Sequence, residues 1–181
     1  MSKYRNALPQ LSSRDVFITD GGIETDLIFH HGMELPSFAS FVLLQDEKGS
    51  EALRNYFRGY AEIARNEKVG LVLEAATWRS NPGWGKQLGY SENDLEEINR
   101  KAIDMLVEFR KEYETEDTKV VISGCLGPRG DGYSPSNVMS AQEAEKYHSV
   151  QINTFKQTEA DLVTAITMNY VEEALGIAQA A

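Results

Sequence analysis

Four short apolar runs, each followed by a longer segment with helical periodicity, constrain the fold of this chain more than any other feature of its sequence. The runs cover residues 15–19, 69–74, 119–123 and 161–166. Runs of this length, rich in branched apolar residues, predict buried strands. Strands that alternate with helices form a parallel sheet with the helices packed outside it. The sequence therefore predicts an α/β fold made of four strand–helix units.

Each predicted helix has a recognisable start. Ser50 is a possible cap for the first helix, in which apolar residues recur every three or four positions from Leu53 to Ala64. Residues 91–94 and 140–143 each match a capping box and are predicted to open the second and third helices. The fourth helix is predicted to begin at about Val171 and to continue to the end of the chain.

Two architectures accommodate four such units, namely a doubly wound open sheet and part of a (β/α) barrel. A complete barrel needs eight units and about 250 residues, so four units correspond to half of one. The last helix reaches Ala181 without a glycine cap or a following proline, which indicates a chain truncated at its carboxyl end. Residues 81–89 contain one proline and three glycines and are predicted to form a loop. We expect a single domain over residues 1–181.

Composition and charge exclude several classes of function. The 181 residues include 18 basic and 28 acidic side chains, which give a formal net charge of −10. Such an acidic chain lacks the basic surface that binds nucleic acids or anionic membranes. No apolar run is long enough to span a bilayer and no signal sequence is evident, so we expect a cytoplasmic protein. The single cysteine, Cys125, excludes an intrachain disulfide and a metal site built from several cysteines of this chain.

The first strand is predicted to end at a possible ligand-binding turn. Asp20 is followed by Gly21 and Gly22. In a parallel α/β fold, functional residues lie in the loops that follow the carboxyl ends of the strands. The carboxylate of Asp20 can accept hydrogen bonds from a ligand's ammonium group, while the glycines let the backbone approach closely. Alternatively, Asp20 caps its own turn, and the spacing does not separate these two interpretations.

A second group of polar residues lies at the end of the second predicted strand. Glu74 and Thr77 can orient a polar ligand there, and Trp78 or Trp84 can exclude water from it. The alternative is a polar strand end with both tryptophans packed under a long loop. The pattern alone favours this alternative.

The third predicted strand is followed by a glycine-rich loop over residues 124–132. Its amides can cradle an anion, but it matches neither the P-loop nor the dinucleotide-binding fingerprint, so a flexible connector is the simpler interpretation. We interpret Cys125 as a small buried apolar residue rather than a nucleophile. His30, His31 and His148 lack the spacing of a metal site.

Residues 19–27, Thr-Asp-Gly-Gly-Ile-Glu-Thr-Asp-Leu, resemble the opening motif of the homocysteine S-methyltransferase family. The resemblance covers essentially the whole chain and corresponds to the first half of the family's domain. It implies an α/β fold that is the first half of a TIM-type (β/α)8 barrel. Four further segments agree in order with the family: Glu74 to Trp78, Gly124 to Pro128, Tyr147-His148 with Gln151, and Ala160 to Val163.

The resemblance also implies a function. In this family three cysteine thiolates hold Zn²⁺, and the metal keeps homocysteine as a thiolate that attacks a methyl donor, a step in methionine biosynthesis. The complete parent protein is expected to methylate homocysteine or a related thiol or selenol amino acid. Asp20, with Gly21 and Gly22, matches the family's contact with the amino-acid part of the substrate, and Thr77 falls in a pocket-lining segment. No segment resembles a cobalamin, folate or S-adenosylmethionine site, so the methyl donor is not indicated.

Two departures from the family pattern concern the metal and the substrate. The family's zinc cysteines lie in the later half of the barrel and Cys125 matches none of them, so this chain alone is expected to bind no zinc and to be inactive. The family's fourth strand usually ends in a Phe-Glu-Thr-like segment, whereas this chain has Ala165-Ile166-Thr167, where an isoleucine replaces a substrate-binding carboxylate. The alternative function is that of a non-catalytic half-barrel that binds a small molecule or another subunit.

A half-barrel has two open edges. The strands predicted at 16–19 and 162–166 each lack a partner on one side. The inner face of the sheet, which bears Val72, Val121 and Val163 or their neighbours, also lacks the strands that would fill the barrel. Because two copies can satisfy each other's edges, we expect a homodimer or a poorly soluble chain.

Overall fold

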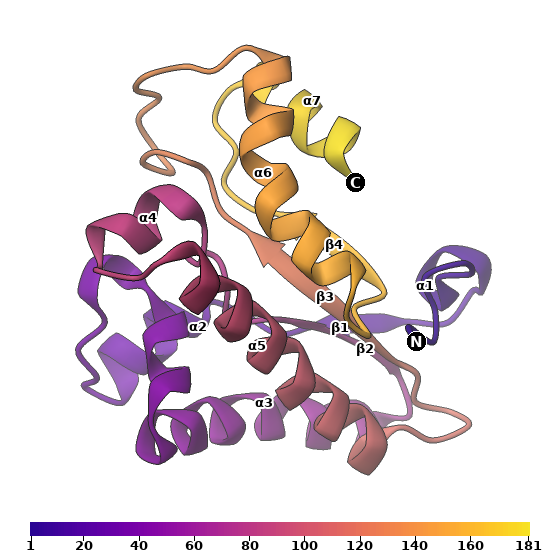
Figure 1. The fold of residues 1–181 in the computed structure, drawn as a ribbon. Helices are drawn as coiled ribbons and strands as arrows, with labels where there is room; N and C mark the ends of the chain where they lie inside the picture. The colour runs from indigo at the N-terminus through magenta and orange to yellow at the C-terminus, as the bar shows by residue number, and fades with distance from the viewer.

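The computed structural model describes residues 1–181 as one parallel four-stranded sheet with its long helices packed against one face (Figure 1). The strands are β1 (Phe17–Thr19), β2 (Gly70–Glu74), β3 (Val120–Leu126) and β4 (Leu162–Ala165). The long helices are α3 (Glu47–Glu67), α5 (Glu92–Tyr113), α6 (Ala141–Lys156) and α7 (Val171–Ala180). The shorter helices are α1 (Pro9–Ser12), α2 (Ile23–Thr25) and α4 (Pro82–Gln87), with tighter or wider turns at Asp26–His30, Pro36–Phe38 and Ser40–Gln45.

The strand order is β1-β2-β3-β4, and every neighbouring pair is parallel. A doubly wound sheet reverses its strand order at a switch point, whereas a barrel adds each new strand on the same side of the previous one. The observed order is therefore that of a barrel. The sheet is not closed, since β1 pairs only with β2 and β4 only with β3.

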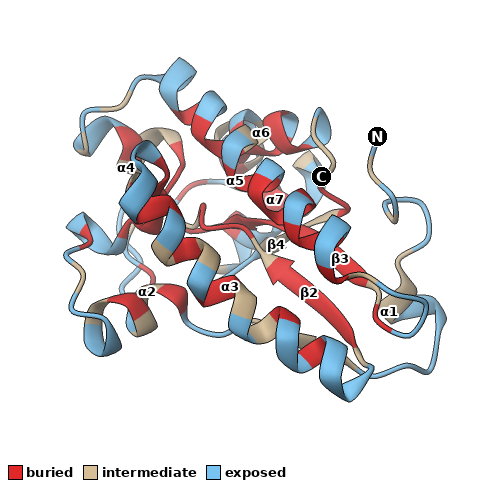
Figure 2. Ribbon diagram, turned by 90° about the horizontal axis from the view of Figure 1, so that it is seen from below, coloured by how far each residue is buried: buried red, intermediate tan, exposed pale blue.

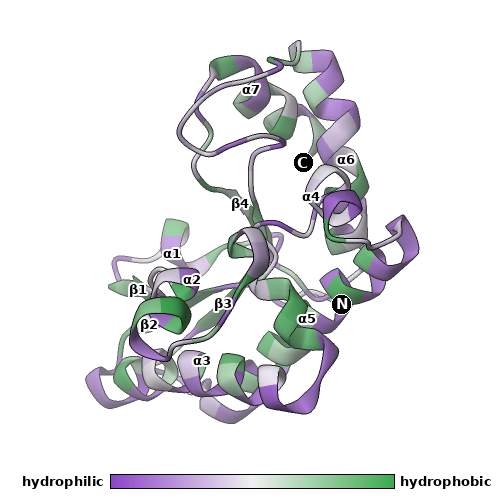
Figure 3. Cartoon of the chain, turned by 90° about the vertical axis from the view of Figure 1, so that its left-hand side faces the viewer, coloured by the Kyte–Doolittle hydropathy of each residue, from purple (hydrophilic) through white to green (hydrophobic).

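The two faces of the sheet differ in composition. The face toward the helices is apolar: Leu71, Leu73, Val120, Ile122 and Leu126 belong to one core cluster with residues of α3 and α5. Figure 3 shows the matching stripes of hydrophobic and hydrophilic residues along these two helices. In Figure 2 the central strands are buried, whereas β4 is only partly so.

The opposite face, which we call the inner face, carries Val72 and Val121 as predicted. In the last strand, however, Val163 packs on the helix side, so its neighbours Leu162 and Thr164 take the inner positions. The inner face becomes polar toward the carboxyl ends of the strands, where the hydroxyl groups of Ser123 and Thr164 form a hydrogen bond of 2.8 Å. This polar end of the inner face is where the candidate site lies.

The helix starts agree with the sequence at two positions and differ at a third. Ser91 and Ser140 form complete capping boxes with Asp94 and Glu143. Helix α3, however, begins at Glu47, and its cap is Asp46, four residues before Ser50. The carboxylate of Asp46 accepts a hydrogen bond from the amide of Gly49 at 2.7 Å. The prediction of Ser50 as the cap was therefore wrong, since Asp46 offers the same cap chemistry one turn earlier.

Two predicted loops contain regular structure. Residues 81–89 include helix α4, which the side chain of Asn81 caps at the amide of Trp84 and in which Pro82 occupies the first position. A proline there costs no hydrogen bond, so its presence does not exclude a helix. Strand β3 also continues to Leu126, beyond the predicted end at residue 123. Gly124 belongs to the strand through its pairing with Val163, and it packs so close to the ring of Phe155 that a Cβ would approach that ring to 2.5 Å.

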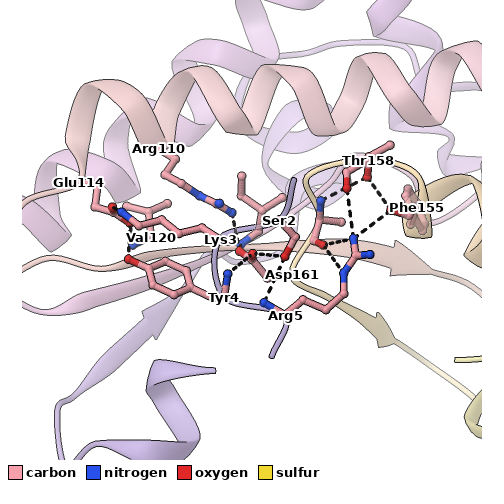
Figure 4. Close-up of polar contacts among 12 residues, drawn as sticks. Ser2, Lys3, Tyr4, Arg5, Arg110, Glu114, Val120, Phe155, Thr158 and Asp161 are labelled. Carbon is pink, nitrogen blue, oxygen red and sulfur yellow. Dashed lines mark hydrogen bonds and ion pairs between the residues drawn. The ribbon is translucent and has the colours of Figure 1, made fainter. Parts of the chain in front are cut away.

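The amino-terminal residues are fastened to the amino ends of β3 and β4 (Figure 4). The carboxylate of Asp161, just before β4, accepts hydrogen bonds from Ser2 Oγ at 2.9 Å and from the amide of Tyr4 at 2.8 Å, and it also pairs with Arg110 of α5. Arg5 donates to backbone carbonyls at the end of α6 and in the turn that follows it: those of Phe155, Lys156, Thr158 and Ala160. This edge of the sheet is thus occupied by structural contacts, which leaves the carboxyl edge for a ligand.

No helix of the protein is both long and apolar enough to cross a membrane.

Candidate functional site

The candidate site lies where the inner face meets the carboxyl edge of the sheet. Asp20 follows β1, Glu74 ends β2, Cys125 lies near the end of β3, and Thr164 lies in β4. Parallel pairing brings these four positions to one edge, with Glu74 opposite Ser123 and Cys125 opposite Thr164. The carboxyl edge of a parallel sheet is where such folds place their ligands.

Asp20 is held by groups from two other elements. Its Oδ1 accepts the amide of Glu74 at 2.8 Å, and its Oδ2 lies 3.1 Å from the hydroxyl of Tyr56 in α3. The same hydroxyl lies 2.8 Å from the carbonyl of Gly21, so its single proton serves both acceptors. Burial, together with the charge of Glu74, raises the pKa of Asp20 to about 7, although these hydrogen bonds act in the opposite direction. The carboxylate therefore joins β1, β2 and α3.

The two glycines after Asp20 have different reasons to be there. A Cβ on Gly21 would lie 2.7 Å from the hydroxyl of Tyr60, so a side chain at this position would displace that ring. A Cβ on Gly22 would make ordinary contacts with Thr25. Close approach of the backbone is therefore a property of Gly21. The role of Tyr56 could not be predicted from the sequence, because its spacing in α3 is that of a core residue.

Glu74 is an inner-face carboxylate whose Oε2 atom is buried and has no hydrogen-bond partner. Burial raises the pKa of Glu74, and the hydroxyl groups of Thr164 and Ser123 offset part of this effect. No basic side chain contributes to its charge environment. A carboxylate in this setting has a strong electrostatic preference for a cation.

Cys125 is the only cysteine, and it lies 5% exposed on the inner face. Burial and the charges of Glu74, Glu24 and Asp20 raise the pKa of its thiol well above the ordinary value. The thiol is therefore protonated at neutral pH, which makes it a poor nucleophile and a poor metal ligand.

Thr77 is fully buried, and it connects the second and third strands rather than presenting a free hydroxyl group. Its Oγ1 donates to the carbonyl of Cys125 at 2.9 Å. Its own carbonyl accepts the side-chain amide of Gln151 at 3.0 Å, and that amide also donates to Asn99. The position of Thr77 thus fixes the start of the β2–α4 connection relative to β3 and α6.

The two tryptophans enclose a buried arginine. The guanidinium carbon of Arg79 lies 3.8 Å from the ring centroid of Trp78 and 3.9 Å from that of Trp84, and Nη1 donates to the carbonyl of Gly130. The indole of Trp78 also donates to Thr167 at 3.2 Å, beside the end of β4. This stack ties together the loops that follow β2, β3 and β4. The run Trp-Arg followed by a second tryptophan was its only sequence signal.

The glycine-rich loop after β3 packs closely on Trp78 and makes hydrogen bonds to carboxylates of the same chain. Gly127 passes so close to Trp78 that a Cβ would approach the tryptophan carbonyl to 2.2 Å. Its amides bind carboxylates of the same chain: that of Arg129 donates to Glu173, and those of Tyr133 and Ser134 donate to Asp131. These contacts fasten the loop to Trp78 and to helix α7.

The histidines lie apart from the site. His148 is buried in α6, and its Nε2 lies 2.9 Å from Glu173 in α7. His31 pairs with Asp26 at 3.3 Å on the surface. No group of three or more His, Cys, Asp and Glu side chains lies close enough together to hold a metal ion.

Comparison with known proteins places this geometry in a family. A family model described as homocysteine S-methyltransferase matches residues 17–181, nearly the whole chain. The chain belongs to the homocysteine S-methyltransferase family. No curated protein matches it closely enough to count as a relative.

Two solved structures share the fold. Both are of the homocysteine methyltransferase MmuM from Escherichia coli, in an oxidized form (TM-score 0.76, 18% identity) and a metallated form (TM-score 0.74, 16% identity). They cover 94% and 96% of this chain, whereas this chain covers 59% and 61% of theirs. The four strand–helix units therefore correspond to half of a TIM-type barrel, and the chain spans about three fifths of the length of these enzymes.

Proposed function

We propose that this chain forms the amino-acid-binding half of a homocysteine S-methyltransferase barrel. In the complete barrel, a methyl group would be transferred to the thiolate of homocysteine or of a related thiol or selenol amino acid. The observation that carries this proposal is the buried carboxylate of Asp20 at the carboxyl end of β1, within the segment that matches the family. A buried carboxylate there suits the ammonium group of an amino acid.

The neighbouring residues suit the same role. Gly21 lets the backbone pass close to Tyr60 beside Asp20, while Tyr56 and the amide of Glu74 fix the orientation of the carboxylate. Thr77 holds the β2–α4 connection at the floor of the site. Trp78 reaches across the strand ends to Thr167, where it limits the access of water to a bound ligand.

Zinc, which the family implies, does not fit the residues of this chain. Catalytic zinc in this family is held by thiolates, but the single Cys125 is buried with its proton retained and has no histidine beside it. We therefore assign no step through a metal to these residues. We propose that the isolated chain transfers no methyl group.

Amino-acid binding to the chain tests the role of Asp20. L-methionine, which carries the amino-acid group without a reactive thiol, is titrated into wild-type protein and into Asp20→Asn, with binding followed by NMR. We expect the variant to bind at least tenfold more weakly, because a charge-assisted hydrogen bond is lost. The matched control is Asp104→Asn, which changes an exposed carboxylate on α5 and should leave affinity unaltered. Equal affinity of wild type and Asp20→Asn would refute the assignment.

A second candidate function is that of a non-catalytic half-barrel that associates with another copy. The observation that favours it is the pair of open edges, where β1 and β4 each have one partner strand and Ile166 is 38% exposed. Unpaired strand edges promote association. Sedimentation of the purified chain at micromolar concentration separates a dimer, which supports this candidate, from a monomer, which contradicts it.

A further inference from the structure

We infer that a small primary amine, in its ammonium form, binds in a cavity between helices α4, α5 and α6, apart from the candidate site at the carboxyl edge of the sheet. The cavity has a volume of about 130 Å³. This is well above the space that a single water molecule needs, so the cavity can hold a group of several non-hydrogen atoms.

The floor of the cavity is polar, and its side chains are hydrogen-bonded to one another. Ser80, Asn99 and Gln151 line it. The side-chain amide of Asn99 donates to the backbone carbonyl of Ser80 at 3.1 Å, and its oxygen accepts the side-chain amide of Gln151 at 3.1 Å. Because Ser80 and Gln151 both bind the same asparagine side chain, an occupant of the cavity lies against both of them.

Two oxygen atoms of these floor residues have no hydrogen-bond partner within the protein. They are Oγ of Ser80 and Oε1 of Gln151, and the two residues are only 1% and 2% exposed. Buried polar atoms are normally satisfied. Two such atoms on residues that line one cavity therefore indicate a ligand that supplies hydrogen bonds.

The hydrogen bonds of Gln151 determine which kind of ligand this is. Both protons of its Nε2 are engaged, one by the carbonyl of Thr77 at 3.0 Å and one by Asn99. Turning the amide group over would point its oxygen at the carbonyl of Thr77, which is also an acceptor. The atom without a partner is therefore the oxygen, which can only accept, so the ligand must donate.

The rim of the cavity adds negative charge. Glu92 and Glu96 of α5 line it, whereas no lysine, arginine or histidine does. The first turn of α5 also lies at the rim, and its amides alone would favour an anion. An anion, however, would meet both carboxylates and the oxygen of Gln151. A donor that carries a positive charge fits all three.

The remaining lining suits a short alkyl group. Three of its residues are apolar, namely Pro82, Leu95 and Val150. Val150 is 46% exposed on α6, so an alkyl group at the rim would remove apolar surface from water. A primary ammonium ion combines three donors and a positive charge with such a group.

Other occupants make different predictions. Water would satisfy the two oxygens without any dependence on charge, and a small neutral amide would do the same. A metal ion also binds oxygen atoms, but no three His, Cys, Asp and Glu side chains come together to hold one. The experiment therefore includes a probe for each class.

The test measures the binding of four probes to the 181-residue chain at about pH 7, where an alkylamine keeps its proton. The probes are ethylammonium chloride, acetamide, sodium acetate and calcium chloride, and binding is followed by NMR of the side-chain amide signals of Asn99 and Gln151. We expect ethylammonium to shift both signals and to bind at least about tenfold more tightly than acetamide. Acetate should leave the signals unchanged.

Two substitutions assign the binding to this cavity. Ser80→Ala removes a hydroxyl group that has no partner in the protein, so the fold should be kept while ethylammonium binds at least about tenfold more weakly. Glu92→Gln should weaken ethylammonium binding severalfold, and more so at low ionic strength. The matched controls, Ser134→Ala and Glu97→Gln, change exposed residues outside the lining and should leave the affinity unaltered.

Several results would overturn the inference. Equal affinity for ethylammonium and acetamide would show that charge has no part in the binding, and tighter binding of acetate or calcium would assign the cavity to another class of ligand. No change with any probe would mean that the cavity holds water only. Wild-type affinity in Ser80→Ala would also refute the site, and the exposed Glu92→Gln keeps the test available if Ser80→Ala does not fold. None of these results bears on the proposed function, which depends on Asp20.

Discussion

The raised pKa of Asp20 makes a quantitative prediction about stability. An acid that keeps its proton longer in the folded state than in the unfolded state destabilises the fold as the pH rises, because the unfolded chain then binds fewer protons. The unfolded chain loses this proton near the ordinary value of 3.8, and the folded chain loses it at about 7. Since one pH unit corresponds to 1.36 kcal/mol, the shift between these values corresponds to about 4 kcal/mol.

Asp20→Asn removes this titration while keeping a side chain of the same shape. Its amide oxygen can still accept the amide of Glu74, and any hydrogen bond that the substitution weakens adds an offset that does not vary with pH. We therefore expect the free energy of unfolding of the variant, minus that of wild type, to increase between about pH 4 and pH 7. The increase should approach about 4 kcal/mol and level off above the folded-state pKa.

Urea denaturation at half-unit intervals of pH measures this difference directly. The control Asp104→Asn, with an exposed carboxylate, should give a difference that is flat over the same range. A flat difference for Asp20→Asn, or one that falls with pH, would show that Asp20 ionises normally in the folded protein. The inference that the carboxylate of Asp20 favours binding of a cation would then be wrong.

Three further predictions concern other parts of the molecule. The purified, tag-free chain should contain no stoichiometric zinc and should transfer no methyl group to homocysteine, so equimolar zinc by elemental analysis would contradict the donor-set reasoning. Asp161→Ala should lower the free energy of unfolding by about 3–5 kcal/mol in chemical denaturation, since it leaves Arg110 buried without its partner. A decrease in the free energy of unfolding of less than about 1 kcal/mol would mean that water replaces the carboxylate. Methionine affinity should rise between about pH 6 and pH 8 as Asp20 ionises, and an affinity that falls over this range in NMR titrations would exclude Asp20 as an ammonium acceptor.

The sequence predicted the repeating units well because each depends on local periodicity. The apolar runs at β2 and β3 and the capping boxes at Ser91 and Ser140 are short-range signals, and the structure confirms them. Helix α4 was missed because proline and glycine are read as loop residues, although Pro82 follows the cap residue Asn81. The extension of β3 through Gly124 was missed because glycine is read as a loop residue, whereas Gly124 pairs with Val163, which lies 39 positions away in the sequence.

The site was predicted less completely, for a related reason. Asp20 and Gly21 follow a strand and could be selected from that position alone. Tyr56 and the Ser123–Thr164 pair could not, since their roles depend on which faces of distant elements meet. The contacts of the glycine-rich loop could not be predicted either, because the amide of Arg129 donates to Glu173, which lies 44 positions away in the sequence.

The attachment of the first residues to the last strand has a consequence for how the chain folds. Ser2 and Tyr4 bind Asp161, so this contact spans 157 to 159 positions of sequence. Contacts of such large separation form late, after the loop between them has been closed by other structure. During synthesis, Ser2 and Tyr4 cannot bind Asp161 until that residue has left the ribosome, whereas Lys3 and Tyr4 can already contact Glu114 and α3 and α5 can already pack on β2 and β3. An amino-terminal deletion or fusion is therefore a perturbation of the fourth unit, and its effect should appear first in the final, slowest stage of folding.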